Sequence, residues 1–145
     1  MPVIRDILAS KGSNVLSIPP DTTALEAAEL MNTHRVGSLV VMDGGRVIGM
    51  FTERDILTRV VVARRDPGET AVREVMSTRV ICCQPQTNLD EARVAMKDRR
   101  IRHLPVVDEM GQLLGLISIG DLNAYDANSQ ESTIHYLEQY IHGRA

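Results

Sequence analysis

Gly115-Leu116-Ile117-Ser118-Ile119-Gly120-Asp121 is the stretch of sequence that decides the fold. The apolar residues around its start predict a buried strand, and the residues from Asp121 onward can continue as a helix. Ser118 is then expected to cap this helix, with Asp121 in its first turn. The free N–H groups of a helix start favour phosphate, and a carboxylate beside a hydroxyl can accept hydrogen bonds from both hydroxyls of a ribose. The alternative is a capping box, in which the two side chains merely start the helix.

The same pattern occurs a second time, in Gly49-Met50-Phe51-Thr52-Glu53-Arg54-Asp55, and Asp55 precedes Asp121 by 66 residues. The repeat extends upstream, where a set of helix residues recurs with a shift of 65: Thr22, Glu26, Ala27 and Met31 match Thr87, Glu91, Ala92 and Met96. One extra residue in a predicted turn, at 108–111 against 43–45, accounts for the change of shift. Two copies of one supersecondary unit are expected to bury a shared face.

Together the two copies resemble a tandem pair of cystathionine β-synthase (CBS) domains, from about Val3 to about Ala127. The resemblance is carried by the two Gly-x-x-[Ser/Thr]-x-x-Asp motifs, the two Glu-Ala-x-x-x-Met helices and the segment His-Leu-Pro-Val at 103–106. This family consists of regulatory modules found in nucleotide-sensing proteins. The resemblance therefore implies a binding module for adenosine compounds.

Composition sets limits on the fold and on the partners. The chain has 145 residues, a net charge of −3, no tryptophan and one phenylalanine, so its core is expected to be aliphatic. The slightly acidic balance does not favour general binding to nucleic acid or to acidic membranes. Since no apolar run reaches membrane-spanning length and the start lacks a signal-peptide pattern, the expected location is the cytoplasm. Neither a nucleophile signature nor a metal-ligand spacing is apparent, so we expect no enzyme activity and no metal site.

The expected fold class is α+β, with two pseudo-symmetric β-α-β-β-α repeats packed sheet to sheet around a single core, plus a C-terminal helix. The expected boundaries are 1–63 for the first repeat, 64–70 for a linker, 71–127 for the second repeat and 128–145 for the tail. The predicted strands are 15–18, 39–42, 47–51, 80–83, 105–107 and 113–117. The predicted helices are 4–8, 24–31, 72–76, 89–96 and two that begin at Thr52 and Ser118. The helix from Thr52 is expected to bury Ile56, Leu57, Val60 and Val61.

The resemblance also implies two clefts between the repeats, one for each motif. In each cleft the aspartate would hold the ribose, the Thr or Ser would contact ribose or phosphate, and strand backbone would read the adenine edge. The ligand would be AMP, ADP or ATP, with NAD or S-adenosylmethionine as alternatives. Mapped onto this chain, the ligand-binding residues are Ser17, Val36, Gly37, Ser38, Leu39, Met50, Thr52, Arg54, Asp55, Val80, Ile81, Cys82, Ile101, Arg102, His103, Leu104, Pro105, Leu116, Ser118 and Asp121.

The two clefts are expected to differ in charge, because Arg102 and His103 stand where the first copy has Gly37 and Ser38. We expect the tighter site to use Ser118 and Asp121 with one of these basic residues, and its affinity to fall between pH 6 and 8 as His103 deprotonates. The alternative is that the basic residues reach across to the Thr52–Asp55 cleft, where Arg54 is the motif's own candidate phosphate contact.

Three hypotheses for function follow. The first is a regulatory module that binds an adenine nucleotide and signals to an effector protein by changing shape or assembly. The second is a ligand-free interaction scaffold, and the third is a thiol redox sensor based on Cys82 and Cys83. A homodimer is expected through an apolar stripe in the tail, formed by Ile134, Leu137, Ile141, Tyr136 and Tyr140.

Overall fold

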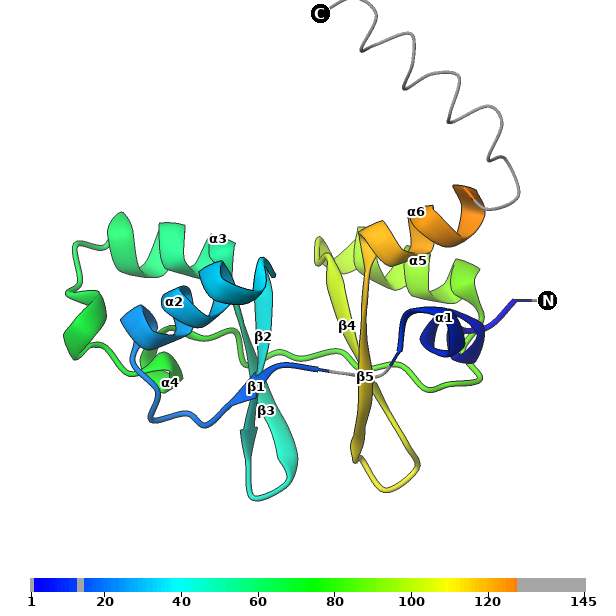
Figure 1. Ribbon diagram of the computed structural model, residues 1–145, viewed down its shortest axis with the longest axis horizontal. Coiled ribbons are helices and arrows are strands. Elements are labelled where there is room, and N and C mark those ends of the chain that lie inside the picture. The colour runs from blue at the N-terminus through cyan, green and yellow to red at the C-terminus, as the bar shows by residue number, and fades with distance from the viewer. Residues whose placement is uncertain (1, 13–14, 128–145) are drawn as a thin grey trace, which may run out of the picture.

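The computed structural model describes residues 2–12 and 15–127, so the expected tail helix and its dimer stripe lie outside the described residues. Two lobes stand side by side, each with strands toward the middle and helices outside (Figure 1). The first lobe contains β1 (Ser17–Ile18), α2 (Ala24–His34), β2 (Ser38–Asp43), β3 (Arg46–Thr52), α3 (Glu53–Asp55), η1 (Ile56–Val61), η2 (Pro67–Glu69) and α4 (Val72–Val75). The second contains α1 (Ile4–Lys11), α5 (Leu89–Arg99), β4 (His103–Val107), β5 (Leu113–Ser118) and α6 (Ile119–Ala127). The predicted α+β fold of two repeats is confirmed.

The long helices α2 and α5 show the repeat in detail. Each begins at a polar cap, since Thr23 Oγ1 accepts from Glu26 N at 3.1 Å and Asn88 Oδ1 accepts from Glu91 N at 2.7 Å. Each ends at an arginine in the left-handed region, Arg35 and Arg100, both with φ of 54°. Three matching apolar residues of each helix are buried: Ala24, Ala27 and Met31 in α2, and Leu89, Ala92 and Met96 in α5. The 3.6-residue period therefore identified the buried faces correctly.

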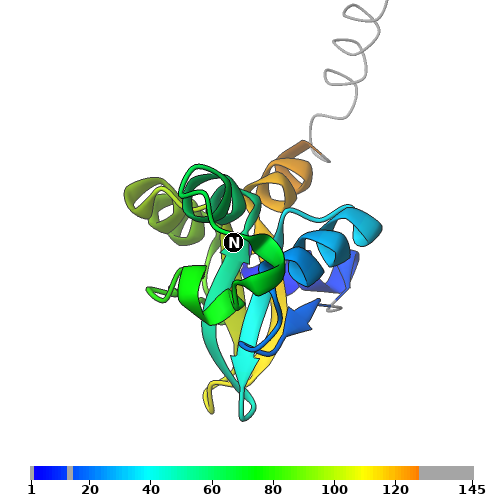
Figure 2. The same cartoon turned by 90° about the vertical axis from the view of Figure 1, so that its left-hand side faces the viewer.

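Each lobe has an antiparallel hairpin, β2–β3 or β4–β5, and β1 adds a parallel edge to the first. Strand alternation gives each sheet one face toward its own helices and one toward the other lobe. On the face toward the other lobe, Val40 pairs with Met50 in the first hairpin, and Pro105 pairs with Leu116 in the second. Val40, Met50 and Pro105 are buried. The turns of the two hairpins project at the same end of the molecule in both views (Figures 1 and 2).

The leading helix of each repeat packs on the other lobe. Ile4 and Ile7 of α1 belong to the apolar cluster of α5, β4, β5 and α6, while Val72 and Val75 of α4 belong to that of α2, β2 and β3. Backbone hydrogen bonds fix both helices on the opposite lobe, an arrangement that we call the exchange of the leading helices. Ile4 N donates to Thr87 O at 2.9 Å, and Val72 N donates to Thr22 O at 2.7 Å. The expectation of a single core is therefore wrong, because the buried apolar residues form two clusters, one in each lobe.

Three further details differ from the sequence-based expectations. The predicted strand 80–83 is reduced to one parallel bridge, at Cys83 with Val106, and the strand at 15–18 to Ser17–Ile18. Residues 77–83 instead connect the lobes, pairing with β3 at Ser77 and with β4 at Cys83. The helix that begins after Thr52 becomes π-helical from Ile56 to Val61. This changes the residues that face inward, so Val60 is buried while Leu57 and Val61 are 57% and 60% exposed.

Candidate functional site

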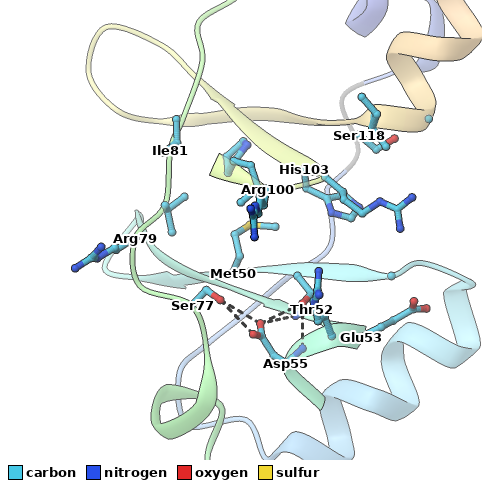
Figure 3. A pocket seen from close by; sticks show the side chains of 18 residues that line it. Met50, Thr52, Glu53, Asp55, Ser77, Arg79, Ile81, Arg100, His103 and Ser118 are labelled. Carbon is cyan, nitrogen blue, oxygen red and sulfur yellow. Dashed lines mark hydrogen bonds between the residues drawn. The ribbon is translucent and has the colours of Figure 1, made fainter. Parts of the chain in front are cut away.

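A cleft between the lobes, here called the first cleft, has a volume of about 510 Å³. Thr52 and Asp55 lie on its first-lobe side, opposite Arg100 and His103 of the second lobe (Figure 3). The connection between the lobes contributes Ser77, Arg79, Val80 and Ile81. The remaining lining residues are Gly37, Met50, Glu53, Arg54, Ile101, Arg102, Pro105, Ser118, Ile119 and Gly120. A ligand in this cleft would touch both lobes and their connection.

Asp55 is the buried carboxylate of the first cleft, with 6% of its surface exposed. Its Oδ2 atom accepts from Thr52 N at 3.0 Å and from Thr52 Oγ1 at 3.2 Å, and Thr52 Oγ1 in turn accepts from Asp55 N. The capping box is thus present. Ser77 Oγ approaches from the connection, at 3.2 Å from Oδ1 and 3.4 Å from Oδ2 (Figure 3). Because a hydroxyl can rotate, Ser77 can give up this bond to another donor.

Positive charge concentrates around the first cleft although the chain as a whole is slightly acidic. Among the residues that the structure describes, four arginines of the lining form neither an ion pair nor a side-chain hydrogen bond: Arg54, Arg79, Arg100 and Arg102. The lining carboxylates are Glu53 and Asp55. Unpaired guanidinium groups at the edge of a cleft favour an anion, and their planar donor geometry suits phosphate.

The second cleft is smaller, about 280 Å³, and contains the Ser118–Asp121 motif. Asp121 Oδ2 accepts from Ser118 N at 2.8 Å, and Ser118 Oγ accepts from Asp121 N at 3.0 Å. Lys11, the last residue of α1, also donates to Asp121 Oδ2, at 2.7 Å. Burial acts to raise the pKa of Asp121, but the hydrogen bonds from Lys11 and Ser118 outweigh it and the net pKa is lowered. The other lining residues are Val15, Leu16, Val36, Gly37, Ser38, His103 and Leu116.

His103 lies between the two clefts and lines both. Burial lowers its pKa, an effect that nearby Arg102 and Lys11 reinforce and that Asp121 and Glu53 oppose. His103 therefore takes up its proton at lower pH than an ordinary histidine does, so the fall in affinity that we expected between pH 6 and 8 would be displaced toward lower pH. Arg102 lines the first cleft and not the second. The tighter site that we expected at Ser118 and Asp121 thus lacks Arg102.

The lowered pKa of His103 predicts that folding stability decreases in mild acid. The unfolded chain binds a proton at His103 near pH 6.5, whereas the folded chain does so only at lower pH. The contribution of His103 to the free energy of unfolding is therefore fully present above about pH 7. It is lost as the pH falls from there toward the lower pKa of the folded chain. Urea unfolding at pH 7.5 and 5.5 measures the effect, and His103→Gln is expected to reduce the difference. An equal loss of stability in the variant would contradict the assignment.

Most of the predicted ligand residues line one of the two clefts, but four do not. Leu39 and Leu104 are buried, 0% and 1% exposed, in the clusters beneath the sheets, because strand alternation turns them toward the helices. Ser17 and Cys82 are exposed and are absent from the lining of both clefts as the described residues define them. Each cleft also combines residues of both repeats. Met50 and Ile101 both line the first cleft, and Val36 and Leu116 both line the second.

Sequence reasoning missed Lys11 and Ser77, which contact the two carboxylates, and Arg79, which lines the first cleft. Ser77 and Arg79 lie in the connection, which was predicted to lead into an ordinary strand. No local pattern relates Lys11 to Asp121, which follows it by 110 residues. The exchange of α1 onto the second lobe brings them together.

The cysteines do not favour thiol chemistry. Partial desolvation by neighbouring residues raises the pKa of Cys82, although its side chain is exposed, and burial raises the pKa of Cys83 to about 12. Both thiols are therefore protonated at neutral pH. A protonated thiol is a poor nucleophile and a poor redox sensor. Within the part of the chain that the structure describes, no three His, Cys, Asp or Glu side chains gather as metal ligands do. None of the described helices combines the length and apolar character needed to cross a bilayer.

Comparison with known proteins gives a consistent result. The family profile of the CBS domain matches residues 4–62 and 72–128. The chain is 37% identical over 142 residues to the CBS domain-containing protein YhcV of Bacillus subtilis (strain 168), which covers 98% of this chain and 97% of that protein. It is 34% identical over 149 residues to the mitochondrial CBS domain-containing protein CBSX3 of Arabidopsis thaliana, covering 97% of this chain and 72% of that protein.

Two solved structures have the same fold. A protein with CBS domains from Burkholderia ambifaria MC40-6 superimposes with a TM-score of 0.86 at 36% identity, over 89% of this chain and 96% of that one. The CBS domain pair of protein MJ0100, solved with 5′-methylthioadenosine and S-adenosyl-L-methionine, has a TM-score of 0.78 at 22% identity, over 89% and 98% of the two chains.

Proposed function

Because the chain belongs to the CBS-domain family, as two CBS domains in tandem, we propose that it is a regulatory module that binds an adenosine nucleotide in its first cleft. CBS-domain pairs are regulatory modules, and the pair of MJ0100 was solved with two adenosine compounds. One observation carries the proposal: the first cleft combines the carboxylate of Asp55 with four arginines that form no ion pair among the described residues.

The proposed ligand pose follows from the positions of these groups. Asp55, on the first lobe, accepts hydrogen bonds from the two ribose hydroxyls once Ser77 Oγ rotates away. The adenine lies against the apolar residues Met50, Ile81 and Pro105, near the backbone of the connection. The phosphates then meet guanidinium groups from both lobes, Arg54 of the first and Arg100 and Arg102 of the second. The nucleotide would thus join the lobes through polar contacts.

Signalling requires that the nucleotide prefer one of two states of the protein. A ligand that touches both lobes and their connection can favour one arrangement of the lobes. The second state would be recognised by an effector protein or a second copy of the chain. Exposed apolar residues of η1, Leu57 and Val61, offer a surface for such a contact.

The charge of the first cleft predicts a ranking of ligands. Affinity is expected to rise from adenosine to AMP to ATP, since each added phosphate gains charge-assisted hydrogen bonds. S-adenosylmethionine, whose sulfonium carries a positive charge, should bind more weakly than ATP. Titration calorimetry at 50 mM and 300 mM salt measures both effects, and the preference for ATP over adenosine should shrink at the higher salt concentration. Arg100→Gln with Arg102→Gln should reduce ATP affinity by tenfold or more and leave adenosine affinity nearly unchanged.

The competing function is a ligand-free interaction scaffold, which the intact capping boxes and the exposed apolar residues of η1 would also suit. The same titrations separate the two functions. An adenosine compound that binds with the predicted ranking supports the nucleotide module. If neither adenosine, AMP, ATP nor NAD binds at millimolar concentration, the scaffold is correct and the proposal is wrong.

A further inference from the structure

The carboxylate of the second cleft already has a cationic partner from another part of the chain. Lys11 Nζ donates to Asp121 Oδ2 at 2.7 Å and to the backbone oxygen of Leu116 at 2.8 Å. Both acceptors belong to the Gly-x-x-Ser-x-x-Asp motif or to the strand that leads into it, and Lys11 itself lines this cleft. The ammonium group therefore uses one of the acceptor positions at Asp121 Oδ2, and a ribose hydroxyl that approached this atom would have to compete with it.

The equivalent carboxylate of the first cleft has a different partner. Asp55 receives the Ser77 hydroxyl, at 3.2 and 3.4 Å, and the nearest cation to it is Arg59, whose Nε is 3.8 Å from Oδ1. Arg59 also donates to the carbonyl oxygen of Met76 at 3.0 Å, and it does not line the first cleft. A ribose hydroxyl can replace a neutral hydroxyl with little change in charge. Replacing an ammonium that holds a carboxylate at 2.7 Å costs a charge-assisted hydrogen bond.

The exchange of leading helices explains why Lys11 can do this. Ile4 and Ile7 fix α1 against the second lobe, and this places the last residue of the helix over the start of α6. The side chains of Lys11 and Asp121 remain 35% and 24% exposed, so solvent weakens the ion pair and a ligand can reach it. The contact is therefore reversible.

We infer that Lys11 acts as an internal competitor for nucleotides in the second cleft, so that the first cleft fills alone and the second opens only when Lys11 is displaced. This inference rests on the proposed function, because it concerns the same class of ligand. It assigns to Lys11 the choice between one and two ligands for each chain. Displacement would also free the end of α1, which connects occupancy of the second cleft to the position of the N-terminal helix.

The test isolates the second cleft by removing the ribose contact of the first. In an Asp55→Asn chain, AMP is titrated before and after the further change Lys11→Met, which retains the aliphatic stem and removes the charge. Lys11→Met is expected to strengthen AMP binding by about tenfold, the value of one partly exposed charge-assisted bond. Lys11→Arg in the same chain keeps the charge and should leave AMP binding weak. Adding Asp121→Asn to the Lys11→Met chain should remove the gain.

Each outcome decides the inference separately from the proposed function. Equal AMP affinity with and without Lys11→Met overturns the inference, even if the chain with Asp55 intact binds one nucleotide in the first cleft. A gain that Asp121→Asn removes supports it, even if the first cleft binds nothing. Should Lys11→Met unfold the chain, Lys11→Gln serves the same purpose, and a gain in neither variant overturns the inference.

Discussion

Replacing Asp55 with asparagine is expected to weaken AMP binding to the first cleft by about two orders of magnitude or more. In the proposed pose this carboxylate accepts from two ribose hydroxyls, and each charge-assisted hydrogen bond is worth about 1.5–3 kcal/mol. Asparagine removes one of the two acceptor oxygens and the charge behind the other, a loss that corresponds to about a hundredfold change in the dissociation constant. Titration calorimetry with AMP measures this change directly.

Two controls distinguish recognition of the ribose from damage to the fold. Asp55 is buried and also accepts from Thr52, so thermal unfolding must show that the Asp55→Asn chain is folded. The second control changes the ligand instead of the protein: 2′-deoxy-AMP should bind the unmodified chain at least tenfold more weakly than AMP. Asp121→Asn is the matched variant, and we expect it to change AMP binding little because Lys11 already occupies Asp121. If AMP and its deoxy analogue bind alike, Asp55 does not hold the ribose.

Duplication made the fold predictable. A single Ser-x-x-Asp pattern fits any capped helix, but two copies with matching upstream residues define a repeat and, with it, paired sheets. The helix faces were predicted well because burial follows the 3.6-residue period, as in α2 and α5. The strand expected at 80–83 was predicted from four apolar residues alone, and such short runs do not distinguish a strand from an extended connection.

The two carboxylates of the site could be found from sequence because they belong to the motifs. Their partners could not, since those depend on which segments the fold brings together. Lys11 reaches Asp121 through the exchange of α1, and Ser77 reaches Asp55 from the connection between the lobes. For the same reason the sequence left open whether Arg102 serves its nearest motif or reaches across to the Thr52–Asp55 cleft, and the structure places it in the lining of the latter. Charge patterns along a chain indicate a candidate anion site but not which cleft contains it.

Replacing Gly49 with alanine is expected to destabilise the fold by about 2–3 kcal/mol, the upper part of the range for overpacking. Gly49 is the glycine of the first motif, and it lies where the connection between the lobes pairs with β3. A Cβ atom there would be 2.6 Å from Met76 Sδ and 2.9 Å from the backbone oxygen of Ser77. Met76 could move, but the backbone of Ser77 exchanges two 2.9 Å hydrogen bonds with Met50 and cannot. Since φ of Gly49 is not in the left-handed region, alanine introduces no backbone strain there, and the close contacts account for the loss of stability.

Gly115, the equivalent glycine of the second motif, provides the matched control. A Cβ atom at this position would meet Leu8 Cδ2 at 2.6 Å, which is the end of a flexible side chain and can rotate away. Gly115→Ala should therefore cost less than about 1 kcal/mol, and the entropy lost by the unfolded chain could offset part of that. Urea unfolding at one pH compares the two variants, and equal losses would contradict this account. Because the Ser77 hydroxyl also donates to Asp55, Gly49→Ala should disturb the first cleft as well, while Gly115→Ala should leave AMP binding there unchanged.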